Sequence, residues 1–197
     1  MKSQRKDLSH IILAVVSFLT SIDKFTYFGY GSNMLTCKLK DRCPSAVPIG
    51  ICKIKKHSLK FHKVSHAVSK KNQIRDISGK GDMVPSESET DEVYVVLFSI
   101  DKSEESSLDK AEGYPRFGYD KKTIDVITIK GEKYRAVMYF ANDIDSKKKP
   151  YHWYKEQVVQ GAREHGLPED YIKKIKDVES IPDQDQEREK IQSKHLS

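Results

Sequence analysis

Apolar and polar positions along the 197-residue chain predict a series of strands with helices between and after them. The aromatic, β-prone run from Phe25 to Tyr30 leads into Gly31-Ser32-Asn33, which predicts a strand ending in a tight turn. Met34 to Arg42 then has the pattern of a short helix. The clearest strand is Glu92 to Ile100, because its consecutive apolar residues indicate burial on both faces.

Further elements follow from local signals. Ile49 to Ile54 and Ser58 to Val64 favour two strands. Asp101-Lys-Ser-Glu104 is a capping-box-like start for a helix that runs to about Ala111. Gly113 stands where it would end that helix.

The second half of the chain adds a hairpin and two helices. Tyr119 to Ile129 and Tyr134 to Ala141 flank Lys130-Gly131-Glu132, which is a β-hairpin signal. Pro150 and Pro168 each open a stretch with an apolar stripe at helical spacing. The order of elements predicts an α+β fold in which helices pack on a small curved mixed β-sheet or barrel.

Two polar segments have no clear periodicity. Residues 65–91 are rich in Gly, Lys and Ser, and predict a long excursion over the surface. Within them the apolar pair Met83-Val84 is a candidate for pairing with a sheet. From Pro182 onward the composition predicts a solvated tail. We therefore expect one domain over residues 25–181, an extension over 1–24 and a polar tail over 182–197.

The N-terminal extension is ambiguous. Its apolar run from Ile11 to Leu19 follows Lys2, Arg5 and Lys6, and is too short to span a bilayer. It has the character of the central region of a secretory signal, yet no A-x-A-like cleavage site follows it. The alternatives are a signal or anchor, an extra helix, or a dispensable extension. We expect a cytoplasmic protein with no stable membrane span, with export or anchoring through residues 1–24 as the alternative.

Composition narrows the possible partners and cofactors. The formal net charge is +6, but the excess is Lys dispersed among Asp and Glu, which argues against a nucleic-acid partner. The three cysteines Cys37, Cys43 and Cys52 lack CxxC spacing. His57, His62 and His66 have no carboxylate or Cys partner at metal-ligand spacing. We therefore expect no disulfide framework, no metal and no cofactor.

Two local patterns contain residues that could take part in binding or catalysis. The turn after Tyr30 would present backbone N–H groups at the start of a helix, a cradle for an anion or oxyanion. Taken alone, such a turn is more often only a turn. Glu112, in Leu108-Asp109-Lys110-Ala111-Glu112-Gly113, sits at a helix end, where the dipole disfavours its charged form. An ordinary exposed glutamate is the alternative.

Several motifs that occur in one order along the chain indicate a protein family. Tyr30-Gly31-Ser32-Asn33-Met34 resembles the opening motif of the gamma-glutamylcyclotransferase family. Asp91-Glu92-Val93-Tyr94 is similar to a strand of that family, although Tyr94-Val95 replaces its usual Trp-Gly. Residues 108–113 match the motif that bears the family's catalytic glutamate, and residues 150–168 look like its terminal helices. The resemblance covers about residues 25 to 178.

The resemblance implies an enzyme that cyclises a small γ-glutamyl substrate to 5-oxoproline without a cofactor. Glu112 would be the general acid and base. The substrate would be bound by Tyr30, Gly31, Ser32, Asn33, Met34, Tyr119 and Tyr139. For the last two tyrosines, cross-strand packing is an equal alternative to lining the pocket.

Three further questions stay open from the sequence. The leaving group is an amino acid or peptide, or else an amine or another γ-glutamylated metabolite. A non-catalytic binding protein on the same fold is a further alternative. We expect a monomer or a homodimer.

Overall fold

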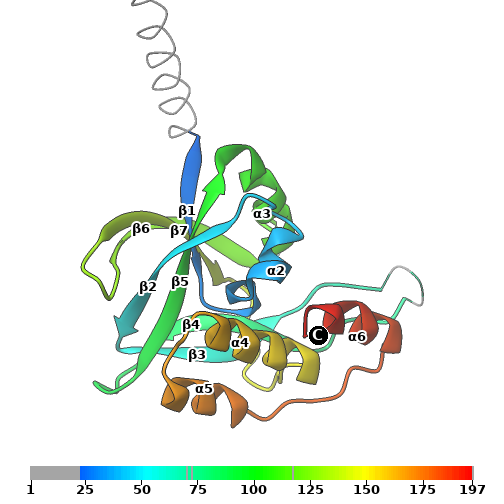
Figure 1. Ribbon diagram of the computed structural model, residues 1–197. Coiled ribbons are helices and arrows are strands. Elements are labelled where there is room, and N and C mark those ends of the chain that lie inside the picture. The colour runs from blue at the N-terminus through cyan, green and yellow to red at the C-terminus, as the bar shows by residue number, and fades with distance from the viewer. Residues whose placement is uncertain (1–22, 70, 72, 117, 197) are drawn as a thin grey trace, which may run out of the picture.

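The computed structural model describes residues 23–69, 71, 73–116 and 118–196. A curved five-stranded sheet has the strand order β2-β5-β1-β7-β6, and β3 and β4 form a separate two-stranded sheet beside it (Figure 1). The strands are β1 (Lys24–Gly29), β2 (Val47–Lys55), β3 (His57–Val64), β4 (Gly79–Pro85), β5 (Glu92–Asp101), β6 (Tyr119–Ile127) and β7 (Lys133–Ala141). The helices are α2 (Thr36–Lys40), α3 (Glu105–Glu112), α4 (His152–Glu164), α5 (Glu169–Lys176) and α6 (Gln186–Ser193), with short 3-10 turns η1 (Ser32–Met34), η2 (Lys102–Glu104) and η3 (Lys194–Leu196).

The larger sheet is mixed. β1 pairs antiparallel with β5 and parallel with β7, while β2–β5 and β6–β7 are antiparallel pairs. The sheet curls until Thr128, just past β6, forms an isolated bridge with Cys52 of β2. Because the edges meet only at this point, the sheet is curved but not a closed barrel. The predicted α+β class and the predicted hairpin of β6 and β7 are confirmed.

β5 forms the centre of the core. Its residues from Val93 to Phe98 are buried, which confirms the prediction of burial on both faces. Because consecutive side chains of a strand point to opposite faces, the burial of every one of them shows that both faces of β5 are covered, and such a strand needs apolar residues throughout. Cys43 and Cys52 are fully buried in the same core, and burial raises the pKa of each thiol to about 11.

The start of α3 differs from the sequence prediction. Asp101 makes no side-chain cap, and the 3-10 turn η2 precedes the helix. The Glu104 carboxylate instead accepts a hydrogen bond from Ser45 Oγ at 2.7 Å. The capping-box prediction is therefore wrong, because a tertiary contact recruits the glutamate. At the other end, Gly113 adopts φ +75° and ends the helix as predicted.

Residues 65–91 are only partly a surface excursion. Their second half forms β4, which pairs antiparallel with β3 and includes Met83 and Val84. Asp76, Ser78 and Asp82 are buried here. Polar composition misled the prediction, because these polar groups find internal partners: Ser78 donates to Asp76, and Lys80 forms an ion pair with the same carboxylate.

The C-terminal segment is not a solvated tail. Residues 186–193 form α6, which lies beside α4 at the right of Figure 1. Asp183 and Asp185 just before it are buried. Asp183 accepts hydrogen bonds from Arg188 Nε at 2.7 Å and from Trp153 Nε1 at 2.9 Å. These charge-assisted bonds compensate the burial of the carboxylate and fix the segment on α4.

The ambiguous apolar run at residues 11–19 lies outside the described residues. Within the part of the chain that the structure describes, no helix has the length and apolar character needed to cross a bilayer.

Candidate active site

The turn after β1 is supported on one side by the hydrophobic core. Ser32, Asn33 and Met34 form η1 and are buried. The Met34 side chain is fully buried in the core, and its carbonyl oxygen lies 2.8 Å from His165 Nε2 at the end of α4. Met34 therefore supports the turn from the core side, whereas Gly31, Ser32 and Asn33 line a cavity of about 440 Å³.

Other groups approach Gly31 closely. Its φ of −110° lies outside the left-handed region, so close packing and not a positive φ is what favours a glycine here. A Cβ at Gly31 would lie 3.3 Å from the Tyr154 hydroxyl, and a Cβ at Gly81 would lie 3.5 Å from the Gly31 Cα. The Tyr154 hydroxyl accepts a hydrogen bond from the Gly81 amide at 2.9 Å. The turn, β4 and α4 therefore meet at one crowded point.

Glu112 reaches this turn from the far end of α3. Asn33 Nδ2 donates to Glu112 Oε1 at 2.7 Å and to the Tyr27 hydroxyl at 2.9 Å. Arg42 Nη1 donates to Asn33 Oδ1 at 2.7 Å. Since a guanidinium can only donate, it fixes the amide with its NH₂ group toward the carboxylate. Two sequence-predicted residues, 79 positions apart, are thus joined directly.

The predicted tyrosines line the same cavity, but their hydroxyl protons are engaged by the scaffold. Tyr30 donates to the Tyr139 carbonyl oxygen at 2.6 Å, and Tyr119 donates to the Gly81 carbonyl oxygen at 2.6 Å. Tyr139 donates to Asp109 Oδ1 at 2.5 Å. Each hydroxyl oxygen can therefore only accept a hydrogen bond from a ligand or pack against it. Burial raises the pKa of all three phenols, so they stay neutral at physiological pH.

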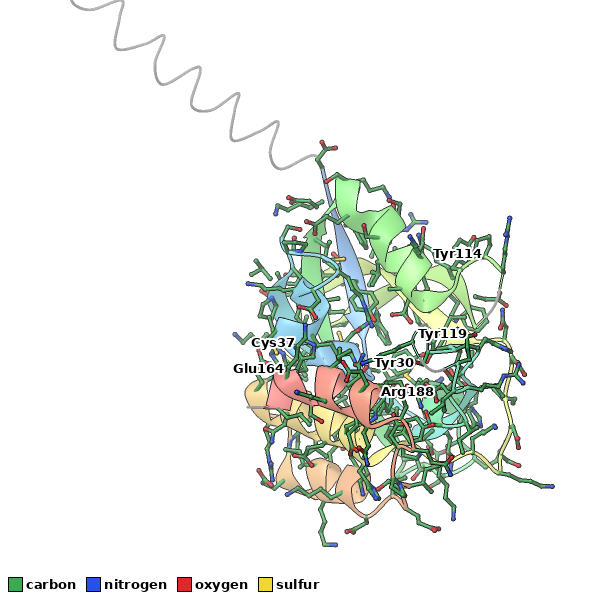
Figure 2. All side chains as sticks on the ribbon, turned by 90° about the vertical axis from the view of Figure 1, so that its right-hand side faces the viewer. Tyr30, Cys37, Tyr114, Tyr119, Glu164 and Arg188 are labelled. Carbon is green, nitrogen blue, oxygen red and sulfur yellow. The ribbon has the colours of Figure 1, made fainter. Side chains whose placement is uncertain are left out.

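Tyr30, Tyr119 and Arg188 gather in the space between α3 and α6 in Figure 2. Tyr30 directly follows β1, Tyr119 begins β6 and Arg188 lies in α6, and all three line the cavity. Arg188 itself is committed to Asp183, whose hydrogen bonds raise the pKa of the guanidinium further. The C-terminal helix is therefore part of the cavity wall, with Arg188 and Gln192 as its contributions.

The cavity is rich in cations. Its basic lining residues outnumber the carboxylates Asp76 and Glu112, and they are Lys38, Arg42, Lys63, Lys80, Lys110 and Arg188. Burial lowers the pKa of Lys38, Lys63 and Lys80 below the ordinary lysine value. Lys80 and Arg188 are paired with Asp76 and Asp183. The other basic lining residues still outnumber Glu112, and such a site favours an anionic ligand.

Sequence reasoning missed most of these cations. Lys63 lies in the predicted strand from Ser58 to Val64, Lys80 lies in the segment predicted as a surface excursion, and Arg188 lies in the predicted tail. Lys38 and Arg42 were assigned only to a short helix. The signal in the sequence is weak, because a lysine in a strand or helix is usually solvated. Only the packing of β3, β4 and α6 around the turn after β1 directs these side chains into the cavity.

Comparisons with known proteins agree with this arrangement. Residues 92–175 match the model of the AIG2-like family. The fold is of the gamma-glutamyl cyclotransferase type. The structure of a protein titled "Gamma-glutamyl cyclotransferase" matches with a TM-score of 0.72 and 29% identity, covering 87% of this chain and 99% of that one.

Sequence relatives establish membership. The gamma-glutamylcyclotransferase of Bos taurus is 33% identical over 157 residues, which is 80% of each chain. That of Homo sapiens is 31% identical over the same length and the same shares. The chain belongs to the gamma-glutamylcyclotransferase family.

Proposed function

We propose that this protein is a gamma-glutamylcyclotransferase that converts a γ-glutamyl amino acid or peptide into 5-oxoproline and the free amino acid or peptide. The observation that carries the proposal is the hydrogen bond between Asn33 and Glu112 at the wall of the cavity. It joins the turn that would bind the substrate to the carboxylate that would move protons.

The chemistry is an intramolecular aminolysis. The α-amine of the glutamyl unit attacks its own γ-carbonyl carbon, a five-membered lactam closes, and the C–N bond to the leaving amine breaks. The attacking ammonium group loses two protons as it becomes the lactam N–H, and the leaving nitrogen gains two as it becomes an ammonium group. Glu112 takes protons from the first nitrogen and returns them to the second. One carboxylate serves both steps because both nitrogens are bonded to the same carbon in the tetrahedral intermediate.

The turn and the crowded cavity would supply orientation and electrostatic help. Backbone N–H groups of Gly31, Ser32 and Asn33 are the donors proposed for the tetrahedral oxygen. Because the nucleophile is tethered, the enzyme mainly has to hold the folded rotamer, and effective molarities of ~10⁵ M or more are known for such geometry. The aromatic walls formed by Tyr30, Tyr119 and Tyr139 would confine the chain of the glutamyl unit.

The excess of cations in the cavity supports an acidic substrate. A γ-glutamyl amino acid carries one carboxylate on the glutamyl unit and another on the leaving amino acid. A γ-glutamyl amine lacks the second. The charge of the site therefore favours amino acids or peptides as leaving groups over amines. Cytoplasmic location and a monomeric or dimeric state stay predictions from the sequence.

A direct assay tests the proposal. Purified protein is incubated with γ-glutamyl dipeptides, γ-glutamyl-lysine and a γ-glutamyl amine, and 5-oxoproline is measured by mass spectrometry. Glu112→Gln keeps the size and one hydrogen-bond acceptor of the side chain but cannot accept the proton. We expect product from the wild type and a loss of about 10²- to 10⁴-fold in the variant.

Glu105→Gln is the matched control, because Glu105 lies on the same helix and pairs with Lys121 and Lys102 outside the cavity. It should retain activity. Comparable rates for Glu112→Gln and the wild type would remove Glu112 as the acid and base. No product from any substrate with the folded wild type would favour a binding protein on this fold.

A further inference from the structure

Lys63 is a buried cation beside the proposed general acid and base. It lies near the end of β3, and only 8% of its surface is exposed. Its side chain lines the cavity, with Nζ 4.8 Å from the centre of the Tyr119 ring. A Cβ built on Gly118 would lie 2.8 Å from Lys63 Nζ and 3.0 Å from the Glu112 carbonyl oxygen. The ammonium group is therefore held close to the end of α3.

The other buried cations of the cavity have partners. Lys80 pairs with Asp76 at 2.9 Å, Lys38 donates to Gln157, and Arg42 donates to Asn33. Lys63 differs, because its Nζ forms no hydrogen bond and no ion pair with any of the described residues. Among the described residues it has a cation–π contact with the face of the Tyr119 ring, which stabilises a cation only modestly.

A buried ammonium group without a counter-ion is costly, and burial lowers the pKa of Lys63 accordingly. The carboxylates of Glu112, Asp76 and Asp143 act on its pKa through space in the opposite direction, but none of them forms an ion pair with it. An anion arriving in the cavity would supply the missing counter-ion and remove much of this cost. The site is thus prepared for a negative group next to Glu112.

We infer that Lys63 binds a carboxylate of the substrate and so positions the reacting nitrogen against Glu112. This inference rests on the proposed function and names a specificity-determining residue for it. In a γ-glutamyl amino acid, each of the two carboxylates is separated by one carbon from a nitrogen that Glu112 would protonate or deprotonate. A cation beside Glu112 can therefore reach either the glutamyl α-carboxylate or the carboxylate of the leaving amino acid.

Other groups near the turn are less suited to this role. The Tyr119 hydroxyl has already given its one proton to the Gly81 carbonyl oxygen. Arg42 is engaged in orienting Asn33. Lys63 retains all of its donor capacity and is more than nine-tenths buried, where a charge-assisted hydrogen bond is strongest.

Binding measurements separate this inference from turnover. Calorimetric titrations use Glu112→Gln protein, which prevents reaction, with and without Lys63→Met. The ligands are γ-glutamyl-alanine, γ-glutamyl-alaninamide, which lacks the leaving-group carboxylate, and 4-aminobutyryl-alanine, which lacks the α-carboxylate. Lys63→Met should weaken binding of γ-glutamyl-alanine by about 10- to 100-fold, the size expected for a hydrogen bond between charged groups.

The trimmed ligands identify the source of the carboxylate. If Lys63 binds the α-carboxylate, the weakening disappears with 4-aminobutyryl-alanine and persists with the amide. The reverse pattern assigns Lys63 to the leaving group. Either pattern supports the inference. Three results would overturn the inference. They are an equal weakening for all three ligands, no weakening for any of them, and no binding of γ-glutamyl-alanine to the Glu112→Gln protein that keeps Lys63.

Two controls protect the result. Lys60→Met removes an exposed lysine from the same strand and should change no affinity. Lys63→Gln is a second neutral variant, and thermal unfolding of both Lys63 variants tests whether they are folded. Turnover of γ-glutamyl-alanine by protein with Glu112 intact is scored separately. Lysine-dependent binding without turnover would leave the inference standing while the proposed function fails.

Discussion

Asn33 holds Glu112 in place: its amide nitrogen lies 2.7 Å from the carboxylate oxygen Oε1, and Arg42 fixes the orientation of that amide from the other side. The turn after β1 and the end of α3 are therefore one unit. An acid and base that must serve two nitrogens in turn needs such a fixed position, because small misplacements of reacting groups reduce rates by about 10²-fold.

Replacing Asn33 tests this unit. Asn33→Ala removes the donor to Glu112, and we expect kcat to fall by about 10- to 100-fold. Arg42→Met leaves the amide in place but frees its orientation, so its effect should have the same direction and a smaller size. Steady-state kinetics on the preferred γ-glutamyl substrate measure both. Full kcat in Asn33→Ala would show that Glu112 is positioned by other contacts.

Gly31 offers a graded test of crowding at the turn. A Cβ would lie 3.3 Å from the Tyr154 hydroxyl, so Gly31→Ala needs only a small shift. Gly31→Val adds two methyl groups against the same hydroxyl, and overpacking of this kind costs about 1–3 kcal/mol. We expect Val to lower activity and unfolding free energy clearly more than Ala does. Equal behaviour of the two variants would mean that the turn has room.

Lys38 predicts a pH dependence of stability. Its side chain is buried among Trp153, Tyr154 and Gln157. Burial, followed by the charges of Arg42 and Lys80, lowers its pKa well below the ordinary value of 10.5. Between the folded and unfolded pKa values, the unfolded chain binds the proton more strongly, so stability rises with pH in that window. Below the folded pKa the full cost of burying the charge is present.

The measurement compares unfolding free energies of wild type and Lys38→Met from pH 7 to pH 10 in urea. The unfolding free energy of the wild type should rise relative to that of the variant as pH rises, by up to about 1.4 kcal/mol per pH unit within the window. Lys130→Met, at an exposed turn, should track the wild type. A constant difference between wild type and Lys38→Met across this range would contradict the assignment.

Arg188 predicts the stability of the C-terminal helix. It donates to the fully buried Asp183 carboxylate and to the Tyr151 hydroxyl at 3.1 Å. Arg188→Met leaves that carboxylate with less compensation, and loss of one partner of a buried pair costs up to about 3–5 kcal/mol. We expect faster proteolysis of the segment from Asp183 to Leu196 and weaker substrate binding, because α6 forms one cavity wall. Lys190→Met, exposed on the same helix, should match the wild type; equal proteolysis of Arg188→Met would show that other contacts hold α6.

Local sequence signals were sufficient where a residue's neighbours in the chain decide its conformation. The strand into Gly31-Ser32-Asn33, the buried β5, the hairpin of β6 and β7, and the helix end at Gly113 all follow from short patterns of apolar residues and glycine. The turn and Glu112 were also identified from the sequence, through motifs shared in order with a family. Short-range patterns and the order of motifs can be recognised without knowledge of the tertiary packing.

Charged residues were harder to assign, because composition alone cannot tell a solvated lysine from one turned inward. Lys63 and Lys80 became cavity residues only because β3 and β4 pair beside the turn, and Arg188 only because α6 packs on α4. The capping box failed for a similar reason, since Ser45 recruits Glu104 across the fold. By itself, then, the sequence determined the strand-turn framework, the family and the candidate acid and base. Only the tertiary structure decided the contact between Asn33 and Glu112 and the cationic lining, because both depend on pairing between segments far apart in the chain.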